Sequence, residues 1–217
     1  MWIFFAVYLA AAGACLWQWG SPEPASGIDL FSGGFFALAP LWFFENRTFL
    51  KSVSATKELQ DEALGNTYDP GLHQWVIPLT LAELAVFLDY GHWRLLPELA
   101  SPVLQSTGLV IWAMTPLWLL WTDKYLREHF GHSDIGSRII TSGPYGLVRH
   151  PRYTGVVASR IAFSLLFASI MGWLLSIAWV VLILRRIHRE ELHMREQYGS
   201  LYQEYSSKTR RLIPWVY

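Results

Sequence analysis

Two polar segments in the C-terminal third carry the residue types that bind charged ligands, and the first of them covers residues 140–155. Its sequence, ITSGPYGLVRHPRYTG, contains Gly143-Pro144, a pair that interrupts a helix. Pro151 keeps the preceding His150 out of the α region and suits the first turn of a following helix. The segment is therefore predicted to be a loop that becomes a helix at Pro151.

The side chains at this loop–helix junction are suited to binding the amino-acid end of a cofactor. Arg149, His150 and Tyr153 lie where backbone N–H groups are free and where the helix dipole favours an anion such as a carboxylate. The simpler interpretation of Arg149 and Arg152 is that they lie at the membrane surface and set the topology.

The second polar segment, residues 185–193, reads RRIHREELH. Arg186 and Glu190 are four residues apart and share a helix face. A carboxylate there can bind an amine or ribose hydroxyls, and an arginine can hold a carboxylate or phosphate through two hydrogen bonds. An ordinary charged helix end has the same pattern. The aromatic and basic residues of 198–214 are predicted to fold back over the first segment.

The composition is that of a membrane protein. Of the 217 residues 53% are hydrophobic and 16% are charged, with a mean hydropathy of +0.25, whereas about a quarter of a soluble domain is charged. Helices of about 20 apolar residues cross a bilayer, and the apolar segments here cover approximately 2–19, 28–44, 72–90, 102–122, 155–170 and 172–187. We expect an all-α integral membrane bundle of about six transmembrane segments, forming one domain over 1–217. The net charge of zero gives no general attraction to nucleic acid.

The apolar run from Val156 to Leu184 permits two topologies. It forms either two short helices with a turn near Met171-Gly172 or one tilted span, which makes six crossings or five. Six crossings with both termini inside place nearly all of the 17 basic residues in the cytoplasm. In that arrangement residues 1–122 hold four transmembrane helices, and residues 123–217 hold the catalytic loop, a helical hairpin and a cytoplasmic tail.

Cysteine and histidine usage gives no indication of a metal site. The single cysteine, Cys15, excludes a disulfide within the chain. None of the seven histidines forms the i,i+4 pair with a carboxylate that places metal ligands on one helix face. No metal is predicted.

The ordered set of motifs from about Trp121 to Tyr217 resembles the isoprenylcysteine carboxyl methyltransferase family, its bacterial relatives and the wider phospholipid methyltransferase group. The set comprises Gly143-Pro144-Tyr145, Arg149-His150-Pro151-x-Tyr153-x-Gly155, Arg186 with Glu190-Glu191, Tyr198-Gly199, Tyr202, Tyr205 and Arg211-Leu212-Ile213-Pro214. Residues 1–100 are similar only in being hydrophobic helices.

The resemblance implies S-adenosyl-L-methionine as cofactor, S-adenosyl-L-homocysteine as product and a bacterial inner membrane location. The cofactor would lie between the loop and the tail, and a lipophilic or lipid-linked substrate would enter from the membrane. Arg186 and Glu190 are implied as catalytic residues, with Arg186 orienting an anionic substrate. The implied cofactor contacts are Ile139, Ile140, Tyr145, Arg149, His150, Pro151, Tyr153, Glu190 and Glu191.

The substrate itself is left open by the sequence. A sulfonium methyl group is already electrophilic, so that positioning and charge arrangement suffice for its transfer to a carboxylate, a thiol or an amine. Arg160 lies inside the predicted fifth helix, where a charge in contact with lipid is costly. It is a second candidate for substrate contact if it faces the bundle interior.

Two other interpretations compete with methyl transfer. Sterol reductases that use NADPH share an Arg-His-Pro-x-Tyr element. They typically have Asn before that Tyr and an acidic residue after the Gly, where this chain has Arg152 and Val156. A non-enzymatic membrane component is the other alternative, because a helix bundle with polar loops needs no chemistry.

Overall fold

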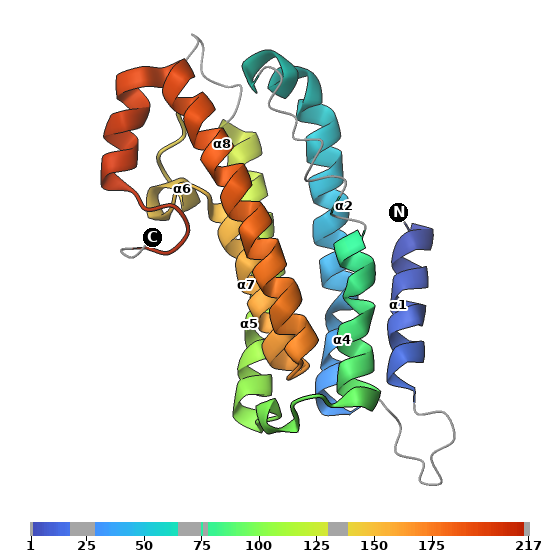
Figure 1. The fold of residues 1–217 in the computed structure, drawn as a ribbon. Coiled ribbons are helices and arrows are strands. Elements are labelled where there is room, and N and C mark those ends of the chain that lie inside the picture. Colours follow the sequence, from blue (N-terminus) through green and yellow to red (C-terminus); the bar gives the residue numbers. More distant parts are fainter. Residues whose placement is uncertain (1, 18–28, 65–74, 76–77, 130–138, 215–217) are drawn as a thin grey trace, which may run out of the picture.

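The computed structural model describes residues 2–17, 29–64, 75, 78–129 and 139–214, and Figure 1 shows them as a bundle of long helices. The described residues form no strand, which confirms the prediction of an all-α fold. The elements in chain order are α1 (Trp2–Leu16), α2 (Leu30–Leu64), α4 (Leu84–Leu88), a π-helical turn (Asp89–Trp93), a 3-10 turn (Pro97–Leu99), α5 (Pro102–His129), α6 (Pro144–Leu147), α7 (Pro151–Leu166) and α8 (Ile170–Lys208).

Two helices, α5 and α8, are long and apolar enough to cross a membrane. Helices α1 and α2 contribute shorter apolar stretches, Ile3–Leu16 and Leu30–Glu45. On α5 the large apolar side chains of one stripe are exposed rather than packed: Val103, Val110, Met114, Leu117 and Trp121. A stripe of this kind is unfavourable in water, so the helices are consistent with a membrane protein. The number of crossings stays a prediction.

Glycines permit α5 and α7 to pack closely. A Cβ atom on Gly108 would lie 2.5 Å from the backbone N of Leu166, and one on Gly155 would lie 2.6 Å from Leu119. Small residues at such contacts are typical of helix pairs in membranes, where close backbone approach provides the attraction. The pair α5–α7 is thereby the rigid support under the loop that precedes α7.

Helices α7 and α8 form a hairpin, which excludes the single tilted span. The turn lies at residues 167–169, earlier than the predicted position near Met171-Gly172. Ala168 adopts a positive φ of 44°, and the Ser169 side chain caps α8 by accepting from the Gly172 N–H at 3.2 Å. Asp89 in turn accepts from the Ser169 hydroxyl at 2.5 Å. A cap and a buried carboxylate therefore fix the turn, whereas Gly172 itself is helical.

Two helices extend beyond the predicted apolar segments. Helix α2 continues beyond the apolar segment to Leu64, and α8 continues past Ile187 to Lys208. Both extensions are rich in Glu, Lys, Gln, Arg and Leu, which favour helix in water as well as in lipid. Gly199 has a φ of 51° inside α8, and Figure 1 shows the last part of this helix turning away from the bundle and running down beside α6.

Candidate functional site

The loop before α7 has the conformation that its glycine and prolines predict. Gly143 has a φ of 59°, and a Cβ atom there would lie 2.5 Å from the ring of Tyr125, so glycine alone fits. His150 is non-helical at φ −122° and ψ 62°, and Pro151 occupies the first turn of α7. The prediction of a loop that becomes a helix at Pro151 is confirmed.

Two helices, α5 and α2, hold the start of α7 in place. The Trp118 indole N–H of α5 donates to the Pro151 carbonyl at 2.7 Å. The Arg152 guanidinium pairs with Asp123 of α5 at 2.5 Å and with Glu45 of α2 at 3.2 Å, and both carboxylates are buried. Arg152 therefore faces two anionic side chains of the bundle and not only the membrane surface.

The predicted pair Arg186 and Glu190 is formed and remains accessible. The Arg186 Nε lies 2.9 Å from Glu190 Oε1, and the two side chains are 31% and 32% exposed. The Tyr153 hydroxyl donates to the same oxygen of Glu190 at 2.6 Å, and His150 Nδ1 lies 3.7 Å from the other oxygen. The structure thus brings together residues of the loop, α7 and α8 around one partly exposed carboxylate.

The neighbouring Glu191 has a different environment, because its side chain is only 3% exposed. Arg149 approaches its Oε1 atom through Nε at 3.0 Å and Nη2 at 2.9 Å, and Arg211 approaches Oε2 through Nε at 3.0 Å and Nη2 at 2.7 Å. His150 Nε2 lies 3.4 Å from Oε1. Burial favours a raised pKa for Glu191, but the hydrogen bonds from His150, Arg211 and Arg149 outweigh it and hold the pKa well below its usual range.

The tail lies against the loop, as predicted. The Arg149 N–H donates to the Arg210 carbonyl at 2.7 Å, and the His150 N–H donates to the Arg211 carbonyl at 3.0 Å. Val148 and Arg210 form a parallel bridge. Two adjacent amides of the loop thereby pair with two adjacent carbonyls of the tail.

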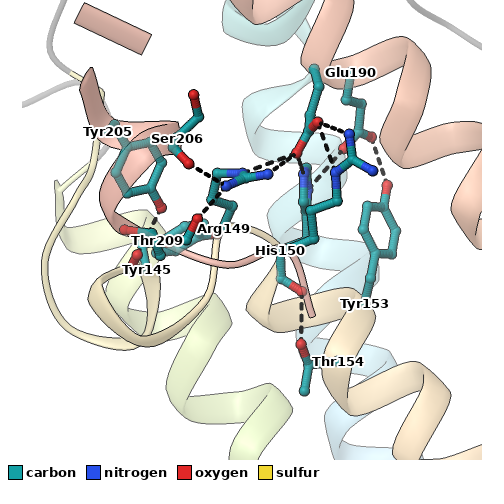
Figure 2. Close-up of polar contacts among 11 residues, drawn as sticks. Tyr145, Arg149, His150, Tyr153, Thr154, Glu190, Tyr205, Ser206 and Thr209 are labelled. Carbon is teal, nitrogen blue, oxygen red and sulfur yellow. Dashed lines mark hydrogen bonds and ion pairs between the residues drawn. The ribbon is translucent and has the colours of Figure 1, made fainter. Parts of the chain in front are cut away.

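Side chains extend this contact at both ends. The Thr154 hydroxyl donates to the Leu212 carbonyl at 2.8 Å, and the Tyr205 hydroxyl donates to the Tyr145 carbonyl at 2.7 Å. Figure 2 shows Tyr205, Tyr145 and the contacts of Arg149 and His150 in one close-up. Burial and then the charge of Asp123 raise the pKa of Tyr145, which keeps its phenol protonated.

Some predicted site residues lie outside this cluster. Ile139 and Ile140 are half-buried in the segment that leads to α6. Arg160 lies two turns further along α7 than Tyr153, pairs with Glu83 and has its guanidinium carbon 4.7 Å from the centre of the Trp179 ring. In the structure Arg160 therefore pairs with an anionic side chain of the protein itself, that of Glu83.

The sequence did not assign site roles to Arg211, Tyr205 or Trp118. In the structure they contact Glu191, the Tyr145 carbonyl and the Pro151 carbonyl, respectively. The motif Arg211-Leu212-Ile213-Pro214 was a usable signal for the first of them. Trp118 had none, because a tryptophan near a helix end is also expected at a membrane interface.

The arrangement is suited to binding a polar ligand. Within the described ranges no group of three or more His, Cys, Asp or Glu side chains is placed to hold a metal ion. A partly exposed carboxylate, a partly exposed guanidinium and an imidazole meet beside the middle of α8, and these groups can hold amines, hydroxyls and carboxylates of a polar ligand.

Comparison with known proteins identifies relatives of two kinds. Residues 100–200 match the family described as phospholipid methyltransferase. The chain is 27% identical over 156 residues to methanethiol S-methyltransferase 2 of Bradyrhizobium diazoefficiens, covering 63% of this chain and 58% of the relative. It is 27% identical over 89 residues to a probable protein-S-isoprenylcysteine O-methyltransferase of Oryza sativa subsp. indica, covering 39% and 45%.

The other kind of relative is a reductase. The chain is 32% identical over 85 residues to a Delta(14)-sterol reductase of Mus musculus, covering 38% of this chain and 20% of the relative. This chain therefore spans less than two thirds of each of these three relatives. No solved structure matches it. The family match and the methyltransferase relatives confirm the resemblance to membrane methyltransferases of the isoprenylcysteine and phospholipid type.

Proposed function

From this resemblance to membrane methyltransferases, we propose that the chain is an S-adenosyl-L-methionine-dependent methyltransferase that acts on a lipophilic substrate at the membrane–cytoplasm interface. The observation that carries the proposal is the Arg186–Glu190 pair, about one third exposed and held beside the loop by Tyr153 and His150. It lies within residues 100–200, the part that matches the family.

The residues present fit the cofactor's polar groups. Glu190 accepts only from Arg186 and Tyr153 among the hydrogen bonds described, and its side chain is about one third exposed. A carboxylate in this state can accept hydrogen bonds from an amine or from ribose hydroxyls. His150, Tyr153 and the start of α7 lie next to it, and a helix start favours a carboxylate group.

The chemistry of the site is positioning. S-adenosyl-L-methionine, when bound, supplies a methyl group that is already activated as a sulfonium. In our proposal Glu190 holds the cofactor, and Arg186 orients an anionic acceptor by hydrogen bonds from its guanidinium. In-line placement of the two partners removes much of the barrier of a bimolecular transfer.

The substrate class is a lipophilic molecule that presents a carboxylate, a thiol or an amine at the membrane surface. The names of the relatives include a methanethiol S-methyltransferase and a probable isoprenylcysteine O-methyltransferase, which supports a thiol or a carboxylate. A methyl-labelled cofactor incubated with the enzyme and membrane lipid extract, followed by identification of the labelled species, tests this.

The binding experiment is calorimetry with S-adenosyl-L-homocysteine on the purified protein in detergent. We expect Glu190→Gln to weaken binding about 10- to 100-fold, because a charged hydrogen-bond acceptor for the ligand is lost. The matched control is Glu196→Gln, an exposed carboxylate on the same helix, which should bind like the wild type. Wild-type protein that binds NADPH and not S-adenosyl-L-homocysteine would contradict the proposal.

A reductase that uses NADPH is the second candidate, because the mouse sterol reductase matches with 32% identity. Its match covers 38% of this chain, whereas the bacterial methyltransferase match covers 63%. The broader match favours methyl transfer, and the calorimetry above distinguishes the two.

The proposed location is a bacterial inner membrane with both termini in the cytoplasm. The basic residues of 185–211 support this orientation through the positive-inside rule. A green fluorescent protein fused after Tyr217 should fluoresce and an alkaline phosphatase at the same point should be inactive; the opposite pattern would exclude a cytoplasmic tail.

A further inference from the structure

One buried carboxylate, that of Glu191, joins three segments that are far apart in the sequence. It contacts Arg149 and His150 of the loop, and Arg211 of the tail (residues 209–214). We infer that Glu191 is a positioning residue and not a cofactor ligand: it locks the tail onto the loop and thereby fixes His150 and Glu190. This inference rests on the proposed function for its effect on binding, but the lock itself is independent of it.

Glu191 has no capacity left for a ligand. A carboxylate offers about four lone-pair directions, and five donor atoms of Arg149, Arg211 and His150 lie within 3.4 Å of its two oxygens. Each arginine uses its Nε and Nη2 atoms on one oxygen, an arrangement that fixes the orientation of both guanidinium groups. The residue is 2% exposed. The preceding residue along α8, Glu190, has the exposed position instead.

Arg149 connects the loop to the end of α8 and to the tail as well as to Glu191. Arg149, which pairs with Glu191, also donates through Nη1 to the Ser206 carbonyl at 2.9 Å and to the Thr209 carbonyl. These carbonyls lie at the end of α8, where a cation is favourable. The backbone amides of Arg149 and His150 pair with the tail. The tail therefore holds the main chain of these two residues, and Glu191 holds their side chains.

The imidazole of His150 transmits this constraint to Glu190. Its Nε2 atom faces Glu191 at 3.4 Å and its Nδ1 atom faces Glu190 at 3.7 Å. If Glu191 loses its charge, Arg149 and Arg211 are left as two adjacent cations without their shared anion. The tail is then expected to move off the loop, and the ring of His150 loses the partner that sets its orientation.

The experiment uses hydrogen–deuterium exchange of the full-length protein and calorimetry with S-adenosyl-L-homocysteine. The first variant, Glu191→Gln, removes the charge and keeps the shape of the side chain. The second, Arg211→Gln, removes the ion pair between the tail and Glu191 at a side chain that is 30% exposed. The control is Arg210→Gln. It removes the same charge from the adjacent residue, which is exposed and contributes its backbone to the bridge.

We expect the amides of residues 149 and 150 to exchange about 10-fold faster or more in both variants, with α5 and α7 protected as in the wild type and binding weakened about 10- to 100-fold. Arg210→Gln should change neither. Weakened binding with unchanged exchange at 149 and 150 would make Glu191 a direct ligand and overturn the inference. Wild-type protein that does not bind S-adenosyl-L-homocysteine would contradict the proposed function. The exchange rates at residues 149 and 150 would still show whether Glu191 holds the tail on the loop. If Glu191→Gln does not fold, Arg211→Gln decides it.

Discussion

Two adjacent residues of the same type have opposite environments in this protein. Glu190 is partly exposed and forms an ion pair with one arginine. Glu191 is buried and accepts hydrogen bonds from two arginines. Consecutive residues of an α-helix point about 100° apart. One therefore faces the open side of the loop while the other faces the tail. In our proposals the same motif thus supplies a binding group, Glu190, and a positioning group, Glu191.

At this scale Tyr153 provides a direct test of how Glu190 is held. Tyr153→Phe removes the hydrogen bond of 2.6 Å to Glu190. We expect S-adenosyl-L-homocysteine binding to weaken about 10-fold with little change in Tm, because the carboxylate that we propose holds the cofactor loses a hydrogen bond while packing is kept. Tyr198→Phe, on α8, is the control. Equal effects of both variants would contradict a role of the Tyr153 hydroxyl.

The lowered pKa of Glu191 predicts that the stability of the folded protein depends on pH. Its pKa is lowered on folding from an ordinary value of 4.5, so the folded state binds fewer protons than the unfolded state below that pH. The stability that this gives is present above about pH 4.5 and is lost as the pH falls further. In thermal melts from about pH 5 to pH 3, we expect the Tm of Glu191→Gln to fall less than that of the wild type. Glu196→Gln should follow the wild type.

At the scale of elements, the helix pair α5–α7 determines where the loop begins. The backbones approach at Gly108 and Gly155, and Trp118 of α5 binds the first residue of α7. The turn at residues 167–169 and the ion pairs of Arg152 then fix the helix at both ends. The loop is therefore presented on a rigid support, which a binding site requires.

The test of this support is Gly108→Ala. The added methyl group would lie 2.5 Å from the Leu166 backbone N and 2.8 Å from the Ala162 carbonyl oxygen, and backbone atoms cannot move aside as a side chain can. We expect a loss of about 1–3 kcal/mol in stability in detergent, seen as a lower Tm. Gly13→Ala is the control, because its nearest neighbour is 4.0 Å away. A Tm loss in both would contradict the packing argument.

At the scale of the whole molecule, Arg152 connects the N-terminal half to the C-terminal half. Its guanidinium bridges Glu45 of α2 and Asp123 of α5, which lie far apart in the sequence. Both carboxylates are almost fully buried, at 2% and 3% exposure. A buried carboxylate that loses its cation is strongly destabilising, so this contact should matter for the assembly of the bundle.

We expect Arg152→Gln to lower stability by about 3 kcal/mol, the range for breaking a buried pair, and to lower the Tm accordingly. The double variant Arg152→Gln with Glu45→Gln should recover part of the loss, because one uncompensated charge is removed. A double variant less stable than Arg152→Gln alone would show that the two residues do not act as a pair.

The sequence by itself determined the helical class, the loop that becomes a helix at Pro151 and the pairing of Arg186 with Glu190. These features are local: they depend on proline and glycine backbone geometry, on apolar segment length and on i,i+4 spacing. The resemblance in residues 121–217 was equally readable, because motif order is a property of the sequence.

Only the tertiary structure separated Glu190 from Glu191 and placed Arg152 and Arg160 in ion pairs within the bundle. It also set the α7–α8 turn at 167–169, where the buried Asp89 accepts from the Ser169 hydroxyl. The physical reason is the same in each case. Burial and long-range partners decide what a charged side chain does, and neither can be obtained from the spacing of residues in one segment.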